Sequence, residues 1–186
     1  MAYVLDTSML VDAKDYYYGF SLCPGFWEWV EREAAAGEVI SIIEVRREIE
    51  QQEDELTAWA RRMPKDFFRQ PDAEAASALR EVMEWVQSQD FTERAKRAFA
   101  DDPDARVIAY ALAHGHTVVT HEIDNPDQKS KVKIPTACRA LRVDWAPAFP
   151  WLKARGARFI LDGGRQPRAV EETELKPIQA ALFPDT

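Results

Sequence analysis

The acidic residues that could do chemistry in this sequence follow predicted buried strands. Asp6 comes directly after the apolar run of residues 3–5, and Glu122 and Asp124 come just after the apolar run of residues 117–120. Each run is short and apolar and predicts a buried strand. Open α/β folds bind their ligands beyond the carboxyl ends of such strands. These acids therefore indicate a functional site, although Asp6 could also simply cap the helix that follows it.

Further acids lie on predicted helices, at or beside positions that face the core. The apolar stripe of the helix over residues 103–114 falls three, four and seven residues after Asp104, so this carboxylate is expected to point toward the sheet. Glu48 lies beside the apolar stripe of a helix over residues 44–60, whereas Glu44, one turn earlier, suits a solvated edge. The two helices therefore bring one or two more acids toward the same region.

Carboxylates from four separate segments would repel one another strongly in a cleft unless cations lay between them. Oxygen ligands suit hard cations such as Mg²⁺ or Mn²⁺, and these segments offer neither the cysteines nor the paired histidines that zinc prefers. A bound Mg²⁺ or Mn²⁺ typically activates water and stabilises the charge of a phosphodiester under attack. The acids therefore predict metal-dependent phosphodiester hydrolysis.

The elements that must position these acids alternate between strands and helices along the chain. This order predicts a three-layer α/β/α fold with a central, mainly parallel sheet of about 4–5 strands, of the Rossmann type. The predicted strands cover residues 3–5, 39–42, 117–120, 132–134 and 142–144, and a last short run covers 157–161. The predicted helices cover residues 25–36, 44–60, 72–88, 92–100, 103–114 and 148–155.

The composition is that of a globular protein with one good core. The 186 residues are 46% hydrophobic and carry a formal net charge of −8, which argues against a protein that coats DNA through phosphate contacts. Acids that hold metal ions would contribute to such a charge, so a nuclease remains compatible with it. No apolar stretch reaches the roughly 20 residues that cross a bilayer. The two cysteines have no metal-type spacing, and we expect a cytoplasmic protein without a membrane segment.

Four blocks of the sequence resemble the signature blocks of PIN-domain nucleases. They are Val4–Leu10 (VLDTSML), Val45–Ile49 (VRREI), Asp104–Ala111 (DARVIAYA) and Val118–Glu122 (VVTHE). The chain as a whole resembles a bacterial PIN-like subgroup formerly of unknown function. The resemblance implies a PIN-like nuclease domain over residues 1–161, with a helical insert over 61–100 and a C-terminal tail over 162–186.

What the resemblance implies is a metal-dependent ribonuclease of single-stranded RNA that uses Mg²⁺ or Mn²⁺, as the toxin of a type II toxin–antitoxin pair. The positions that match the family's catalytic acids are Asp6, Glu48, Asp104 and Glu122. Asp124 matches an auxiliary metal ligand, and Ser8 matches the hydroxyl that supports the first acid. Glu44 could be the second ligand in place of Glu48. The alternative function is that of a catalytically inactive PIN-like protein that acts by binding a partner.

Two other features suggest partners. Lys129, Lys131 and Lys133 alternate after the acidic strand end, where they could meet an RNA backbone or only protect a solvated edge strand. In the tail, Leu175, Ile178 and Leu182 recur at helical spacing and predict an apolar face. We expect this face to dock on its own domain, on a second copy in a homodimer or on the antitoxin.

Overall fold

A computed structural model describes residues 1–160 of the chain. The tail over 161–186, with the apolar face expected there, lies outside the described residues. The described part contains a five-stranded sheet in the order β3-β2-β1-β4-β5, with every neighbouring pair parallel. The strands are β1 (Tyr3–Leu5), β2 (Val39–Ile42), β3 (Phe68–Arg69), β4 (Thr117–Thr120) and β5 (Trp145–Pro147). The predicted parallel α/β sheet is therefore confirmed.

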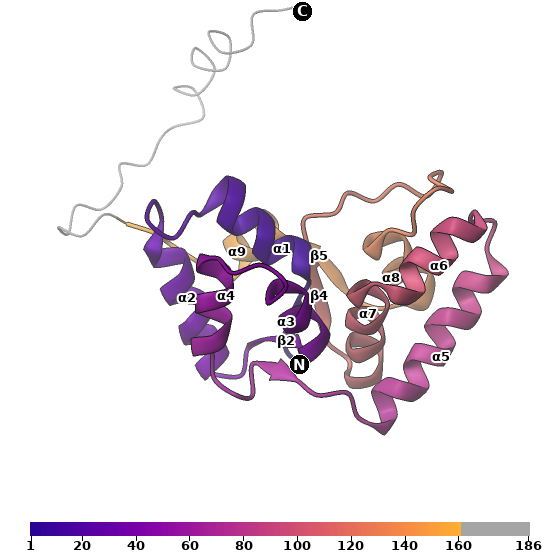
Figure 1. The fold of residues 1–186 in the computed structure, drawn as a ribbon, viewed down its shortest axis with the longest axis horizontal. Helices are drawn as coiled ribbons and strands as arrows, with labels where there is room; N and C mark the ends of the chain where they lie inside the picture. Colours follow the sequence, from indigo (N-terminus) through magenta and orange to yellow (C-terminus); the bar gives the residue numbers. More distant parts are fainter. Residues whose placement is uncertain (161–186) are drawn as a thin grey trace, which may run out of the picture.

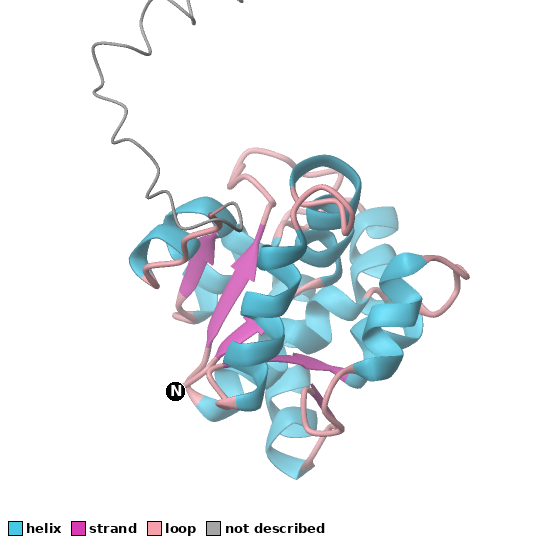
Figure 2. Cartoon of the chain, turned by 90° about the vertical axis from the view of Figure 1, so that its left-hand side faces the viewer, coloured by secondary structure: helices cyan, strands magenta, loops and turns pink. Residues whose placement is uncertain are grey.

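Helices cover both faces of this sheet (Figures 1 and 2). The helices are α1 (Thr7–Asp12), a π-helical turn η1 (Ala13–Tyr17), α2 (Pro24–Ala35), α3 (Ile43–Ile49), α4 (Glu55–Arg62), α5 (Ala73–Ser88), α6 (Glu93–Asp101), α7 (Pro103–His114), α8 (Ile134–Leu141) and α9 (Ala148–Ala154). In Figure 1, α2, α4 and α9 lie on one side of the strands, and α5, α6, α7 and α8 lie on the other. This is the three-layer arrangement that the alternating order predicted.

The core lies where the central strands meet the helices. Val4, Leu5, Val118 and Val119 have no exposed surface, as expected for parallel strands that are covered on both faces. The apolar stripe of α7 is likewise fully buried. Among the described residues, no helix is both long and apolar enough to cross a bilayer.

The single helix predicted over 44–60 is wrong, because the structure divides it into α3 and α4. Asp54 caps α4 by accepting a hydrogen bond from the Thr57 N–H at 3.0 Å. The Thr57 hydroxyl also donates to the carbonyl of Ile49, the last residue of α3, at 2.8 Å. These local hydrogen bonds satisfy the two helix ends and stabilise the break. Glu44 and Glu48 therefore lie on a short helix directly after β2.

The strand predicted over 132–134 is also wrong. Pro135 occupies the first turn of α8, a helix that the sequence analysis did not predict. Arg142 ends α8 in the left-handed conformation, with φ 57°. The last strand therefore begins at Trp145, three residues later than the start predicted at 142. The described residues of the final run, 157–160, form no strand, and the segment 61–100 contributes the edge strand β3 as well as helices.

Candidate active site

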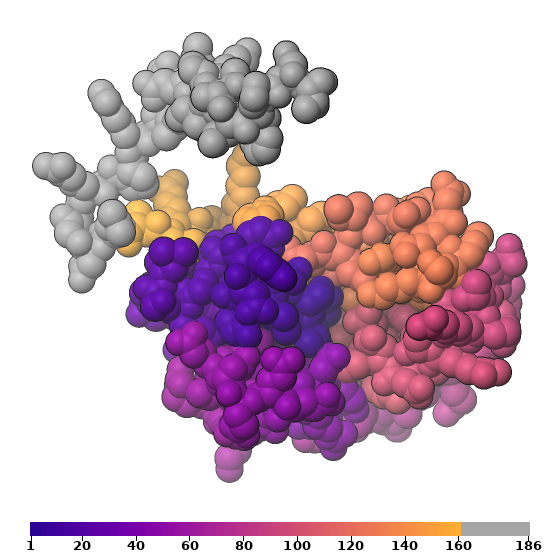
Figure 3. All heavy atoms as spheres, turned by 45° about the horizontal axis from the view of Figure 1, so that its top comes forward, coloured from indigo at the N-terminus to yellow at the C-terminus, as the bar shows by residue number. Residues whose placement is uncertain are grey.

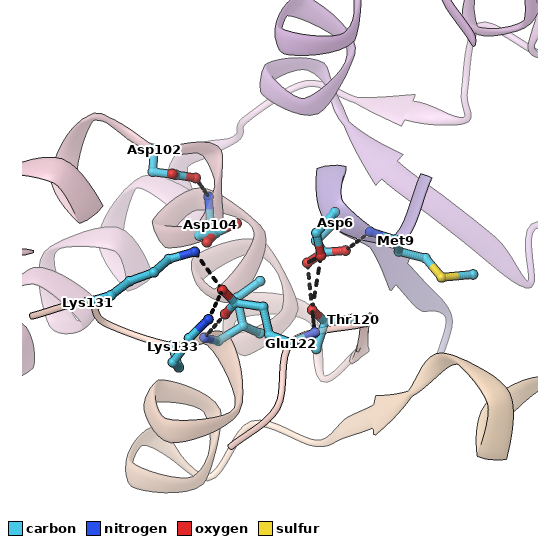
Figure 4. Close-up of polar contacts among 10 residues, drawn as sticks. Asp6, Met9, Asp102, Asp104, Thr120, Glu122, Lys131 and Lys133 are labelled. Atoms are coloured by element: carbon cyan, nitrogen blue, oxygen red, sulfur yellow. Dashed lines mark hydrogen bonds and ion pairs between the residues drawn. The ribbon is translucent and has the colours of Figure 1, made fainter. Parts of the chain in front are cut away.

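Asp6 is fully buried at the end of β1 and is held by three donors (Figure 4). Its Oδ1 accepts a hydrogen bond from the Met9 N–H at 2.7 Å, which caps α1. Its Oδ2 accepts from the hydroxyls of Ser8 and Thr120, each at 2.7 Å. Burial raises the pKa of Asp6 to about 6 even though these three hydrogen bonds favour the charged form. Asp6 is therefore a helix cap and also a member of an acidic cluster.

Asp104 lies in the first turn of α7, opposite Asp6 (Figure 4). The Asp102 side chain caps this helix by accepting a hydrogen bond from the Asp104 N–H at 3.0 Å, and Pro103 takes the first helical position. Within residues 1–160, no hydrogen bond to the Asp104 carboxylate is found. Burial, followed by the charges of Asp6, Asp102 and Glu122, raises the pKa of Asp104 to about 9. Without a bound cation these surroundings therefore favour the protonated form of this carboxyl.

Glu122 completes the cluster, but its charge is already compensated. Its Oε1 accepts hydrogen bonds from the ammonium groups of Lys131 at 2.7 Å and Lys133 at 3.0 Å, and its Oε2 accepts from the Ile134 N–H at 2.8 Å. Burial acts to raise the pKa of Glu122, but these hydrogen bonds outweigh burial and hold the pKa below its ordinary value. Glu122 therefore stays ionised with the side chain only 8% exposed.

Glu48 and Glu44 lie at the margin of the cluster. The Thr7 hydroxyl donates a hydrogen bond to Glu48, which ties α3 to the residue that follows Asp6. Both glutamates line a groove of about 530 Å³ together with Asp102, between α3 and the start of α7. Glu44 also lines a second, smaller and more apolar groove beside α5. Glu48 is therefore the helix acid that is hydrogen-bonded to the residue after Asp6, and Glu44 lies one turn earlier on α3.

The remaining predicted site residues are Asp124 and the three lysines, and each of them contacts a side chain outside the Asp6–Asp104 pair. Asp124 accepts a hydrogen bond from the Thr136 hydroxyl at 2.8 Å and pairs with Arg139, so α8 holds it. The Lys129 ammonium lies 5.8 Å from the centre of the Phe91 ring. The lysines therefore do not form one row, because Lys131 and Lys133 turn inward to Glu122.

The sequence analysis missed the hydroxyls of Thr7 and Thr120. Thr120 is fully buried, and its oxygen both donates to Asp6 and accepts from the Glu122 N–H at 3.0 Å. The signal was a threonine at the last position of a buried strand, where a hydroxyl needs a partner. Thr120 thereby links the first and last acids of the cluster.

Comparison with protein families matches residues 3–159 to the sequence model of a domain of unknown function, DUF4411. The chain belongs to this family. The DUF4411 match spans every acid described above, from Asp6 to Asp124. No match was found among the curated proteins or among the solved structures.

The fit of this DUF4411 domain to a divalent cation depends on how close together its acids lie. In the described part of the chain, no three His, Cys, Asp or Glu side chains already lie close enough together to hold a metal ion. The reason lies in their partners, since Asp6 is turned to α1 and β4 and Glu122 is turned to its lysines. The donor set is nonetheless all oxygen. Asp104 is repelled by Asp6, Asp102 and Glu122, and no hydrogen bond from residues 1–160 reaches its carboxylate. A hard cation fits this carboxylate.

Proposed function

We propose that this chain is a divalent-metal-dependent endoribonuclease of the PIN type, which hydrolyses phosphodiester bonds in single-stranded RNA. The observation that carries the proposal is the convergence of Asp6, Asp104 and Glu122 from β1, α7 and the end of β4 (Figure 4). Burial first, and then the like charges of Asp6, Asp102 and Glu122, raise the pKa of Asp104, and the charge of Lys131 offsets them only in part. Such perturbed carboxyls are typical of functional sites.

Asp6, Asp104 and Glu122 would hold Mg²⁺ or Mn²⁺, with Glu48 at the margin of the site and Asp124 or Glu44 as outer acids. A bound divalent cation supplies Lewis acidity toward water and toward the phosphodiester. The protein's own part is to place the oxygens. Ser8, Thr120 and the Met9 N–H fix the orientation of Asp6. Asp104 must release its proton when a cation enters, because its pKa lies above neutral pH.

The surface beside the cluster offers room for an extended strand of nucleotides. A groove of about 530 Å³ lies on the side of Glu48 and Asp102, and another of about 580 Å³ lies on the side of Glu122 and Asp124. Lys131 and Lys133 bring two positive charges to this second side. Phosphates on a strand that crosses the cluster would meet these ammonium groups once a cation compensates the acids.

A role as the toxin of a type II toxin–antitoxin pair in the cytoplasm is part of the same proposal. Its support is the resemblance of the four acidic blocks to PIN-domain nucleases. The antitoxin is then the inhibitory partner, and a second copy of the chain in a homodimer is the alternative partner. Growth arrest on expression of the chain, relieved by co-expression of a neighbouring gene product, is the result that this part requires.

One observation favours the second candidate, a PIN-like protein without catalytic activity that acts by binding a partner. Lys131 and Lys133 already neutralise Glu122, so the fourth acid is occupied by the protein's own cations. In an inactive protein these ion pairs would be permanent. Titration with Mn²⁺ discriminates, because the nuclease must bind the cation and the inactive protein need not.

The experiment uses the purified full chain with a fluorescent single-stranded RNA, in Mn²⁺ and in EDTA. We expect cleavage only in Mn²⁺, and its loss in Asp104→Asn. The matched control is Asp90→Asn, because Asp90 is an exposed acid. Cleavage that survives in Asp104→Asn, or that is lost equally in Asp90→Asn, contradicts the site assignment.

A further inference from the structure

An aromatic surface lies beside the acidic cluster and plays no part in the chemistry described above. It consists of Tyr17 from η1, His121 from the end of β4 and Phe149 from α9, and we call it the aromatic platform. The Tyr17 and His121 rings stack with centroids 4.8 Å apart and planes 25° apart. Phe149 meets both rings edge-on, at 5.1 Å from Tyr17 and 5.7 Å from His121. Three separate elements therefore build one aromatic group.

The platform faces solvent although its neighbours are buried. Tyr17 is 44% exposed and Phe149 is 49% exposed, whereas Trp151 on the same helix as Phe149 is 2% exposed. In η1 the Tyr18 N–H donates to the carbonyl of Ala13, five residues earlier. Tyr18 then stacks inward on Phe26, with centroids 4.2 Å apart, while Tyr17 remains outside. Such π-helical turns are frequent at functional sites.

The platform is continuous with the acidic cluster. His121 lies between Thr120, which donates to Asp6, and Glu122. One groove of about 580 Å³ is lined by Ser8, Asp12, His121, Glu122, Asn125 and Lys133. In Figure 3 the indigo N-terminal segment, which includes Tyr17, lies beside the yellow-orange segment that includes Phe149. A strand lying in this groove would therefore pass His121, whose ring contacts those of Tyr17 and Phe149.

We propose that Tyr17, His121 and Phe149 form a base-stacking subsite for an unpaired base of the RNA strand next to the acidic cluster. The inference rests on the proposed function and adds the residues that select single strands. Every base has a π-face, so aromatic rings hold bases with little sequence preference. In a duplex both faces of a base are already stacked, and only an unpaired base can reach the rings. The platform therefore accounts for recognition of single-stranded RNA.

The surroundings of the platform suit a nucleotide better than an apolar protein segment. Asn125, Gln128 and Lys133 line the groove with amide and ammonium donors. Two of the acids that line this groove are paired, Glu122 with two lysines and Asp124 with Arg139, whereas Asp12 forms no ion pair within residues 1–160. Ile123 lines the same groove and is 80% exposed, so it supplies an internal comparison. A protein partner would use Ile123 as well as the rings, whereas a stacked base needs the rings alone.

The test measures binding of a fluorescent 12-nucleotide single-stranded RNA to the full chain in Ca²⁺ by anisotropy. Cleavage in Mn²⁺ is measured separately. We expect Tyr17→Leu and Phe149→Leu each to weaken single-strand binding about tenfold, because each removes an aromatic face. Phe149→Tyr keeps a ring and should restore most of the binding, and Ile123→Ala should leave binding unchanged. A hairpin duplex should bind all variants equally weakly. Thermal melting of each variant checks that the fold is intact.

The outcomes separate this inference from the function on which it rests. If the two leucine variants bind and cleave single-stranded RNA like the wild type, the subsite is refuted and the nuclease stands. If Ile123→Ala weakens binding as much as the leucine variants, or if these substitutions change only self-association on size exclusion, the platform is a protein interface. If the wild type neither binds nor cleaves RNA, the proposed function fails and the subsite fails with it.

Discussion

The two sides of the acidic cluster carry the same type of residue in opposite electrostatic states. On the Glu122–Asp124 side, both of these carboxylates have cationic partners, Lys131 and Lys133 for Glu122 and Arg139 for Asp124. On the Asp6–Asp104 side, the partners of Asp6 are neutral donors. Asp104 forms no ion pair within residues 1–160, and the charges of Asp6, Asp102 and Glu122 act on it more strongly than the opposing charge of Lys131. On the compensated side, the protein itself supplies the cations that balance Glu122 and Asp124. The uncompensated side favours a proton or an external cation, and this difference points to where a metal would bind.

The substitution Asp104→Asn tests this contrast most severely. It removes the carboxylate that is repelled by Asp6 and Glu122, so we expect RNA cleavage in Mn²⁺ to fall by at least ~100-fold, as is common for loss of a group that stabilises the transition state. The metal-free variant should melt several degrees higher than the wild type, because an amide neither takes up a proton nor buries a charge when the chain folds. Asp124→Asn on the compensated side is the control and should cost far less activity. Equal losses in the two variants would show that the contrast has no functional meaning.

The Mn²⁺ affinities of variants at Glu48 and Glu44 show how far the metal-binding region extends along α3. Glu48 accepts a hydrogen bond from the hydroxyl of Thr7, the residue after Asp6. Glu48→Gln should therefore weaken Mn²⁺ binding about tenfold, which is a usual loss when a group that orients a metal ligand is removed. Glu44 lies one turn earlier on α3. The substitution Glu44→Gln should therefore change the Mn²⁺ affinity by less than about twofold. Isothermal titration calorimetry measures both affinities. A larger effect of Glu44→Gln would make Glu44 the second ligand.

Removing the charges of Lys131 and Lys133 would leave Glu122 uncompensated, like the acids of the Asp6–Asp104 side. The double substitution Lys131→Gln/Lys133→Gln leaves Glu122 buried without its cations, so Mn²⁺ should bind a few-fold more tightly and the metal-free protein should lose stability. Lys129→Gln is the matched control, because the Lys129 ammonium lies over Phe91 and not at Glu122. Calorimetry and thermal melting at low salt measure the two effects. Tighter binding in the control as well would show that only the net charge matters.

The pH dependence of stability tests the same contrast in the metal-free protein, and its sign follows from the raised pKa values. Asp6 and Asp104 hold a proton more tightly in the folded state than in the unfolded chain, with folded pKa values of about 6 and about 9. Their contribution to stability is complete below the unfolded pKa and is lost as the pH rises through the folded values. The metal-free protein should therefore melt at a lower temperature at pH 9 than at pH 6. Asp104→Asn should flatten this slope, and a wild-type melting temperature that rises over this range contradicts the assignment.

The sequence alone was sufficient for the parallel α/β architecture and for most of its elements. The runs at 3–5, 39–42 and 117–120 are strands as predicted, because continuous apolar residues suit strands that are covered on both faces. The helix of Asp104 begins and ends as predicted, because Asp102, Pro103 and Gly115 are local signals for a cap, a first turn and a left-handed stop. Local chemistry decided these features, so local reasoning found them.

The tertiary structure determined which side chains contact the acids. Lys131 and Lys133 alternate in sequence like the residues of an edge strand, but Glu122 draws both inward, and the Ile134 N–H joins them at the same carboxylate. Thr120 binds Asp6, although 114 residues separate them, only because β1 and β4 are neighbours in the sheet. Tyr17, His121 and Phe149 come together in the same way. Sequence spacing specifies which residues share a strand or a helix, whereas the charge state of an acid depends on neighbours that only the folded chain supplies.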